Sequence, residues 1–185
     1  MGALILASRS PQRRAILEQI GVSFEVRVTD AEELMAGPPE EVALENAYRK
    51  AAGVGPQPSR AVLGVDTIVA LGSRIYGKPA DRKAARETLR ALAGRRHAVI
   101  SGLCLIEGER VRTAAARTLV EFRELPEAAI EQYLDGGEWR ERAGGYAIQG
   151  RGALFVRAIE GDYLNVVGLP VATLVDLAPW LIDPR

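Results

Sequence analysis

The apolar run AVLGVDTIVAL, residues 61–71, constrains the fold of this chain most strongly. It is far shorter than the roughly 20 residues that a membrane-spanning helix needs, so we expect an apolar β-strand. Other segments that read as strands lie at residues 3–7, 24–28 and 97–107, and segments with helical patterning lie between them. Strands and helices mixed along one chain are typical of an α/β fold built on a mixed β-sheet.

Local signals predict where the helices begin and end. Ser10 is a good N-cap and Pro11 suits the first helical position, so a helix is expected over residues 11–20, closed by Gly21. The same signals predict further helices over residues 39–52, 81–94, 126–134 and from 170, with an interruption at Pro179.

The remaining segments are expected to form strands and loops. Residues 97–122 read as two strands joined at Gly108, which predicts a hairpin. Residues 143–155 form a glycine-rich loop that leads into another strand. The helix over residues 39–52 is expected to place three residues on one face: Leu44, Tyr48 and Ala51.

Size and composition restrict the class of protein. The 185 residues suit one domain, with or without two lobes. Lys and Arg total 24 and Asp and Glu total 24, so the net charge is zero, which disfavours a protein that coats nucleic acid. The single cysteine, Cys104, excludes an internal disulfide framework and is expected to be a buried, inert thiol. The N-terminal run lacks the pattern of a signal peptide and no run is long enough for a membrane span, so we expect a cytoplasmic protein.

Arg13 and Arg14 break a local rule. They lie in the first turn of the expected helix, where the helix dipole disfavours cations. Together with Ser8, Ser10 and free backbone N–H groups they could form a cradle for an anion such as phosphate. The alternative is that both arginines point into solvent.

Asp66 and Lys78 are two further candidates. Asp66 lies among apolar residues, where an ionised carboxylate is costly unless it is paired or binds a metal. A carboxylate at the end of a strand, in a cleft, is a common form of general base or magnesium ligand. Lys78 lies between a glycine and a proline and could reach a phosphate, although no P-loop pattern is present. Exposure on an open face is the alternative for each.

Three other sequence features give weaker signals. The acidic residues Asp30, Glu32 and Glu33 could hold a divalent cation or simply be solvated. Gln149, in the glycine-rich loop, has a donor and an acceptor that suit the edge of a nucleobase. His97 is the only histidine, and it is expected to be structural.

Four segments, in order along the chain, resemble the motifs of the Maf family. LASRSPQRRAIL resembles LASxSPRRxxLL, and VLGVDTIVAL…GKPADR resembles GADTxV…GKPxD. GRRHAVISG resembles GRxHxVxTG, and GYAIQGRGALFVRAIEGDYLNVVGLP resembles AYxIQGxGAxFVxxIxGxxxNVVGLP. The matches extend from residue 4 to about residue 175, nearly the whole chain.

The resemblance implies a nucleoside triphosphate pyrophosphatase that cleaves between the α and β phosphates with a divalent cation, Mg²⁺ or Mn²⁺. It implies a two-lobed α/β fold like that of the inosine-triphosphate pyrophosphatases, in one domain over residues 1–185 with a central active-site cleft. By position, Asp66 matches the proton acceptor and Thr67 and Gln149 match residues that set base preference. The positions matching phosphate- and metal-site residues are Ser8, Arg13, Glu33, Lys50 and Lys78.

The IQG and NVVGLP segments resemble the branch that acts on dTTP and UTP, and family members are often homodimers. One departure is Gln12, which stands where the family motif has an arginine among its specificity positions. Glutamine keeps hydrogen-bonding capacity but lacks the charge and planar fork of arginine. Two alternatives therefore stay open: a broad-specificity house-cleaning pyrophosphatase, and a non-enzymatic regulator of cell division that binds a nucleotide or a protein.

Overall fold

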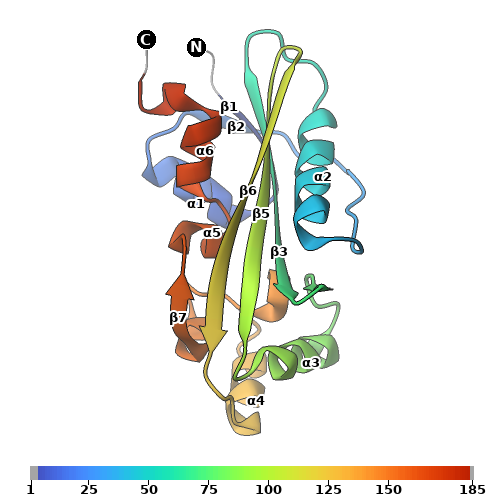
Figure 1. Ribbon diagram of the computed structural model, residues 1–185, viewed down its shortest axis with the longest axis vertical. Helices are drawn as coiled ribbons and strands as arrows, with labels where there is room; N and C mark the ends of the chain where they lie inside the picture. Colours follow the sequence, from blue (N-terminus) through green and yellow to red (C-terminus); the bar gives the residue numbers. More distant parts are fainter. Residues whose placement is uncertain (1–3, 184–185) are drawn as a thin grey trace.

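The computed structural model describes residues 4–183 and contains one mixed seven-stranded sheet (Figure 1). The strand order is β2-β1-β3-β5-β6-β7, and β4 pairs with β3. β1 is parallel to β2 and β3, and the other neighbours are antiparallel. The strands are β1 (Leu4–Ala7), β2 (Phe24–Val26), β3 (Ala61–Leu71), β4 (Arg74–Tyr76), β5 (Arg96–Glu107), β6 (Arg110–Phe122) and β7 (Val156–Glu160).

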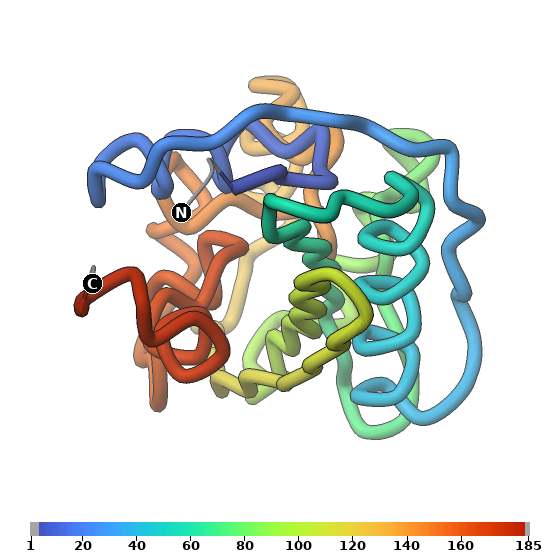
Figure 2. The backbone as a smooth tube through the Cα atoms, turned by 90° about the horizontal axis from the view of Figure 1, so that it is seen from above, coloured from blue at the N-terminus to red at the C-terminus, as the bar shows by residue number. Residues whose placement is uncertain are grey.

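Helices cover both faces of the long strands β3, β5 and β6. Figures 1 and 2 both show α2 and α6 on opposite sides of these strands. In Figure 1, α3 and α4 lie at the lower end of the molecule, opposite the turn between β5 and β6. The helices are α1 (Pro11–Gln19), α2 (Pro39–Ala52), α3 (Arg82–Leu92), α4 (Glu127–Asp135), α5 (Tyr163–Val167) and α6 (Val171–Leu177), and short 3₁₀ helices follow at Ala143–Gly145, Arg151–Phe155 and Pro179–Leu181. The predicted mixed α/β class is confirmed.

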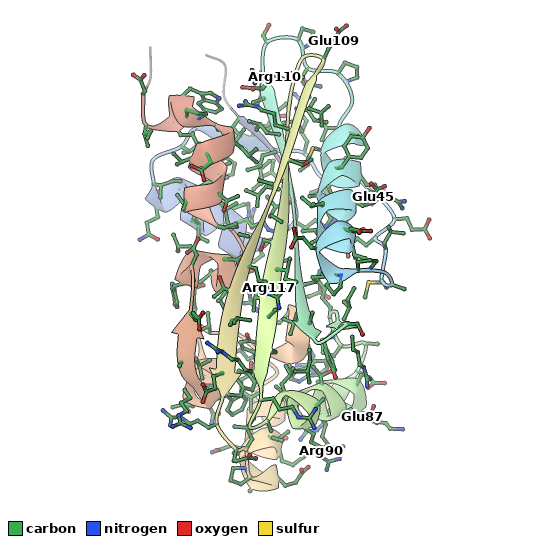
Figure 3. The ribbon with its side chains drawn as sticks, in the orientation of Figure 1. Glu45, Glu87, Arg90, Glu109, Arg110 and Arg117 are labelled. Atoms are coloured by element: carbon green, nitrogen blue, oxygen red, sulfur yellow. The ribbon has the colours of Figure 1, made fainter. Side chains whose placement is uncertain are left out.

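The buried hydrophobic residues form four clusters, and the two largest define what we call the first and the second lobe. Figure 3 marks the ends of the long axis, with Glu109 and Arg110 at the hairpin turn and Arg90 on α3. The first lobe lies toward the hairpin turn and its core is mainly aliphatic, with Leu6, Leu17, Leu63, Leu103 and Leu174. The second lobe lies toward α3 and α4, and its core is rich in aromatic rings: Tyr76, Phe122, Tyr133, Trp139, Tyr146 and Phe155.

A gap in the sheet separates the two lobes on one edge of β3. The edge opposite β5 pairs with β1 over Val62–Gly64 and with β4 over Val69–Leu71. Residues 65–68 pair with neither strand on that edge. Three residues of this unpaired stretch, Asp66, Thr67 and Ile68, line a cavity.

Two glycines allow α2 to lie unusually close to the sheet. A Cβ atom at Gly64 would clash with the carbonyl oxygen of Ala47, and one at Gly102 would clash with that of Ala43. A glycine without a Cβ permits such a close approach of two backbones. The close packing brings the residues of α2 that face the sheet to the middle of β3.

Most predicted elements are confirmed, with bounds that differ by a few residues. α2 spans the predicted range, α3 is capped by Asp81, which accepts a hydrogen bond of 2.7 Å from the Ala84 N–H, and β5 and β6 form the predicted hairpin. The strand predicted at residues 3–7 is described only from residue 4. β4 and α5 were not predicted, because each has only three to five residues and too short a pattern.

The predicted face of α2 is correct for Ala51, which is 1% exposed, and wrong for Leu44 and Tyr48. Tyr48 is 41% exposed and Leu44 is only half-buried. The buried face instead consists of Val42, Ala43, Asn46, Ala47 and Ala51, because small side chains are required where α2 approaches the sheet. A polar residue, Asn46, thus lies on the buried face.

The expectation for Cys104 agrees with the structure. Cys104 is fully buried, and burial raises the pKa of its thiol to about 11, so the thiol stays protonated and inert near neutral pH. Within residues 4–183 no helix combines the length and the apolar character that crossing a membrane requires.

Candidate active site

A cavity of about 820 Å³ lies at the gap in the sheet and is lined by both lobes. The first lobe contributes the segment from Ala7 to Arg13, part of the loop between β2 and α2, and the middle of β3. The second lobe contributes the loop at Gly77 and Lys78 and parts of the segment between Glu138 and Gly150. The volume lies within the range of small-molecule sites.

The N-terminus of α1 forms one wall of this cavity. Ser10 is the N-cap, and its hydroxyl accepts a hydrogen bond of 3.4 Å from the Arg13 N–H. The Arg13 side chain is 8% exposed and donates three hydrogen bonds: from Nε to the Gly168 carbonyl at 2.9 Å, from Nη1 to Ser8 Oγ at 2.8 Å and from Nη2 to Thr67 Oγ1 at 3.0 Å. These bonds fix the guanidinium against the end of the helix.

The prediction that both arginines could contribute to an anion cradle was wrong for Arg14. Arg14 is exposed and is not among the residues that line the cavity, because consecutive helix positions point about 100° apart. For Arg13, burial lowers the pKa of the guanidinium, and the negative charges of Asp66 and Glu33 oppose that shift. Arginine nonetheless remains charged in proteins. One buried cation therefore lies near two carboxylates at the helix end.

Asp66 lies in the middle of β3, as the predicted strand over residues 61–71 requires, and is 6% exposed. Its carboxylate accepts a hydrogen bond on each oxygen, from Lys50 Nζ to Oδ1 at 2.5 Å and from Asn46 Nδ2 to Oδ2 at 3.0 Å. Lys50 Nζ also lies 2.7 Å from Glu33 Oε1. These partners compensate the cost of burying the Asp66 charge.

The paired carboxylates fit a divalent cation that a ligand helps to hold. Glu33 and Asp66 present oxygen atoms on either side of one ammonium group, and Mg²⁺ and Mn²⁺ prefer such oxygen ligands. Within residues 4–183 no group of three or more metal-ligating side chains is gathered. A Mg²⁺ ion in a nucleotide site usually takes only one or two carboxylates and obtains its other ligands from phosphates and water.

The other acidic residues of the loop do not join this pair. Asp30 is highly exposed and forms an ion pair of 2.7 Å with Arg9, and Glu32 is exposed and does not line the cavity. Of the three acids, only Glu33 reaches Lys50.

The second lobe presents exposed groups to the cavity. Lys78 Nζ forms an ion pair of 2.9 Å with Glu141 Oε2, and the two side chains are 57% and 83% exposed. Glu141 has a φ of 59°, the only positive value at a non-glycine position among residues 4–183. Such a backbone conformation is costly for a residue with a Cβ. Gln149 lines the cavity nearby and is exposed.

His97 is structural, as expected. It is buried in the aromatic core, and its Nε2 lies 3.0 Å from the hydroxyl of Tyr146. Burial lowers the pKa of His97 to about 4, so the ring is neutral near pH 7. A neutral ring behind the cavity wall supports packing and does not add a charge to the site.

Comparison with known proteins shows to which family this chain belongs. A family model described as Maf-like protein matches residues 3–179. The chain belongs to the Maf family.

Several relatives of this Maf protein share the name dTTP/UTP pyrophosphatase. A dTTP/UTP pyrophosphatase of Gloeobacter violaceus is 47% identical over 177 residues, which cover 94% of this chain and 93% of the relative. The Pyrococcus furiosus protein of that name is 42% identical over 182 residues, covering 96% and 94%. The Staphylococcus aureus Ham1 protein, a solved structure, matches at 15% identity with a TM-score of 0.47 over 65% of this chain and 72% of its own, too distant to transfer a function.

The three positions that the Maf resemblance links to base preference all line the cavity. Gln12 is half-buried, and its Oε1 accepts a hydrogen bond of 3.1 Å from the Ser10 hydroxyl. The Thr67 hydroxyl lies between Arg13 and Ser101 Oγ, which is 2.8 Å away. Gln149 extends from the opposite wall.

Two buried polar residues that contact site residues of this Maf protein were not predicted from the sequence. Ser101 is fully buried beside Thr67, and Asn46 is 1% exposed beside Asp66. One signal in the sequence could have identified Asn46. It is a polar residue among small apolar residues of α2, and it lies one helical turn before Lys50 and therefore on the same side of the helix. Ser101 lies in an apolar strand, and no local signal distinguishes it.

Proposed function

We propose that this Maf protein hydrolyses nucleoside triphosphates, above all dTTP and UTP, to the monophosphate and pyrophosphate. The observation that carries the proposal is the buried Asp66 carboxylate, bound to Lys50 and near Glu33, in a cavity that also receives the Arg13 guanidinium. The relatives named dTTP/UTP pyrophosphatase, which match over nearly their whole length, support the substrate.

The phosphate oxygens would lie against four groups that donate hydrogen bonds or carry positive charge. These are the Ser8 hydroxyl, the Arg13 guanidinium and the ammonium groups of Lys50 and Lys78. Cations held near the leaving pyrophosphate stabilise the charge that develops there. The local penalty for Arg13 at a helix N-terminus is removed when an anion lies between the two.

Asp66 would act on the water molecule. It orients the water and accepts one proton, while the water oxygen forms a bond to the α-phosphorus. The bond between the α-phosphorus and the α,β-bridging oxygen breaks, and pyrophosphate leaves with that oxygen. The products are one nucleoside monophosphate and one pyrophosphate for each water consumed.

Glu33 and Asp66 would hold the divalent cation, Mg²⁺ or Mn²⁺, and Lys50 would move from these carboxylates toward a phosphate oxygen. When bound, the cation neutralises phosphate charge at the reacting centre. Before the cation and the substrate bind, Lys50 keeps the two carboxylates together, since their like charges would otherwise repel.

The test is pyrophosphate release from dTTP, UTP, CTP, GTP, ATP and 7-methyl-GTP, with Mg²⁺ or Mn²⁺. For Asp66→Asn we expect kcat to fall about 10³-fold, by analogy with the loss of other groups that act directly on reacting atoms. The fold should persist, since the amide is nearly isosteric. The matched control is Glu32→Gln, which neutralises an exposed carboxylate next to Glu33 and should leave kcat within about twofold.

Near-normal turnover in Asp66→Asn would overturn the role of Asp66. No release from any nucleotide by the wild-type protein would overturn the proposed activity and favour a regulator that binds without turnover.

A broad-specificity house-cleaning pyrophosphatase is the second candidate, and Gln12 favours it. The neutral amide of Gln12 lacks the planar, charged guanidinium with which an arginine would bind a base or a phosphate. Release from dTTP and UTP alone supports the pyrimidine enzyme. Comparable rates with purine nucleotides would establish the broad one.

The same reasoning extends to location and assembly. We infer a cytoplasmic enzyme that binds free nucleotides and neither nucleic acid nor membranes, supported by the zero net charge. We also infer a homodimer, on the family resemblance alone. Light scattering after size exclusion gives the mass in solution and tests that assembly.

A further inference from the structure

Asn46 makes three hydrogen bonds from the buried face of α2. Its Nδ2 donates to Asp66 Oδ2 at 3.0 Å and to the Leu34 carbonyl at 3.0 Å, and its Oδ1 accepts from the Leu34 N–H at 2.7 Å. Both amide protons and the amide oxygen are therefore used. The residue is 1% exposed, so these partners replace all the water it would bind in an unfolded chain.

The segment that Asn46 holds is the one that carries Glu33. Residues 27–38, between β2 and α2, contain no helix or strand. Leu34 follows Glu33 directly, and Asn46 bonds both backbone groups of Leu34, as a neighbouring strand would. Three further contacts join α2 to this loop. Lys50 Nζ lies 2.7 Å from Glu33 Oε1, Thr29 Oγ1 donates to the Lys50 carbonyl at 3.4 Å, and Arg49 Nη1 donates an exposed bond of 3.3 Å to the Glu32 carbonyl.

An asparagine has a local cost at this position. It forms helices less well than alanine or leucine, and its neighbours on the same face are small and apolar. A local cost without a local gain commonly marks a functional requirement. Only a side chain with both donors and an acceptor can bind Asp66 and both backbone groups of Leu34 at once.

We propose that Asn46 is a positioning residue that sets the placement of Glu33 relative to Asp66. One amide links the loop that carries Glu33 to the Asp66 carboxylate on β3. The two carboxylates thereby stay together when Lys50 turns to the substrate and a divalent cation takes its place. This inference rests on the proposed function, in which Glu33 and Asp66 hold that cation.

The test compares two variants with one control. Asn46→Leu removes all three hydrogen bonds in a similar volume. Asn46→Asp keeps an acceptor for the Leu34 N–H but loses both donors and places a negative charge against Asp66. The control is Arg49→Gln, which removes the exposed bond to the same loop from the same helix and does not contact Asp66.

Three measurements follow each variant. Hydrogen exchange of the Leu34 amide reports the loop. Steady-state kinetics with dTTP separate kcat from KM. Titration with Mn²⁺ in the presence of α,β-methylene-dTTP, with free Mn²⁺ followed by electron paramagnetic resonance, reports cation binding without any turnover.

For Asn46→Leu we expect Leu34 exchange to rise at least tenfold, kcat to fall at least tenfold with KM within threefold, and Mn²⁺ to bind at least fivefold more weakly. For Asn46→Asp we expect Leu34 exchange within threefold of wild type but a fall in kcat at least as large, because the loop bond remains and the donor to Asp66 is lost. Arg49→Gln should keep kcat and Mn²⁺ affinity within twofold.

Wild-type kcat and Mn²⁺ affinity in Asn46→Leu would overturn the inference. If that variant does not fold, wild-type kcat and Mn²⁺ affinity in Asn46→Asp would overturn it instead. Equal losses in Arg49→Gln would also do so, since they would show that any loosening of the loop has this effect. Absence of turnover in the wild-type protein would overturn the proposed function alone, because exchange and Mn²⁺ binding still report on Asn46.

Discussion

Arg13 and Lys78 are two cations that line the same cavity from opposite lobes, and the protein holds them very differently. Arg13 is 8% exposed and donates three hydrogen bonds to partners on three other segments of the chain. The Lys78 side chain is 57% exposed and has an ion pair with a still more exposed glutamate. The position of the Arg13 guanidinium is therefore fixed by the fold, whereas the Lys78 ammonium can exchange one partner for another at little free-energy cost.

The same contrast applies to the two walls as a whole. The wall of the first lobe includes three buried polar residues, Ser8, Arg13 and Asp66, and Ser8 Oγ accepts a hydrogen bond from Arg13. The wall of the second lobe presents exposed side chains from loops. Groups that act on reacting atoms need fixed geometry, whereas groups that admit and release a substrate need freedom to move. We therefore assign the chemistry to the first wall and capture of the triphosphate to the second.

The sharpest test of the contrast is Arg13→Lys. Lysine keeps the charge but cannot reproduce the planar fork, so Ser8, Thr67 and the Gly168 carbonyl lose partners. We expect kcat/KM to fall about 100-fold and unfolding free energy to fall by about 1–3 kcal/mol, typical of buried groups left without partners. Kinetics with dTTP and urea denaturation measure the two effects.

Arg14→Lys is the matched control for that experiment. Arg14 is the next residue on the same helix and is exposed, so activity should stay within about twofold and unfolding free energy within about 0.5 kcal/mol. If both substitutions lower kcat/KM and the free energy of unfolding equally, the fixed geometry of Arg13 does not contribute to activity, and the contrast between the two walls is wrong.

A smaller effect is expected on the exposed wall. Lys78→Ala should raise the KM for dTTP about five- to tenfold, with kcat within threefold, because one mobile charge for the phosphates is lost. Glu141→Gln should lower KM about twofold, since it frees Lys78 and removes a negative charge near the triphosphate. Steady-state kinetics at low ionic strength give both values, and urea denaturation should show changes below about 0.5 kcal/mol. A collapse of kcat in Lys78→Ala would place that lysine with the fixed groups.

The smallest effect on activity is expected behind the second wall, at His97. Its pKa of about 4 in the folded protein lies below the usual 6.5, so the unfolded chain binds more protons between these values. Stability should therefore fall as pH is lowered from about 6.5 toward 4, by about 2 kcal/mol from this residue at pH 4.5. His97→Gln keeps a partner for Tyr146 and cannot titrate, so it should lose this part of the pH dependence.

Urea denaturation of wild type and His97→Gln at pH 7.5 and pH 4.5 measures the difference, with kcat at pH 7.5 within about twofold. An unchanged pH dependence would show that other groups cause it. A large loss of kcat would show that the aromatic core of the second lobe shapes the chemistry as well.

Much of the fold was predictable because its signals are local. Prolines and capping side chains act within one turn of a helix, and apolar runs mark strands whatever they pack against. The bounds of α2 and β3 and the hairpin of β5 and β6 follow from such signals. Leu44 and Tyr48 were placed wrongly on the face of α2, because the sheet selects small residues there through Gly64 and Gly102, which are distant in sequence.

The site divides in the same way. The sequence by itself indicated which residues are out of place locally: an arginine at a helix N-terminus, a carboxylate within an apolar strand and a cluster of acids. Local patterns could not decide between Arg13 and Arg14, or select Glu33 from its acidic neighbours, because each choice depends on which direction a side chain faces after packing. Only the resemblance to the Maf motifs named Arg13 and Glu33 from the sequence.

Tertiary structure alone brought Lys50 between Glu33 and Asp66, and Asn46 onto Leu34 and Asp66. These contacts join residues 12 to 20 positions apart through the close packing of α2 on the sheet. Hydrogen bonds and ion pairs act over a few ångströms, so only the folded chain determines which polar groups meet. The sequence determined the elements and the types of chemistry, and the packing of α2 decided which residues share the site.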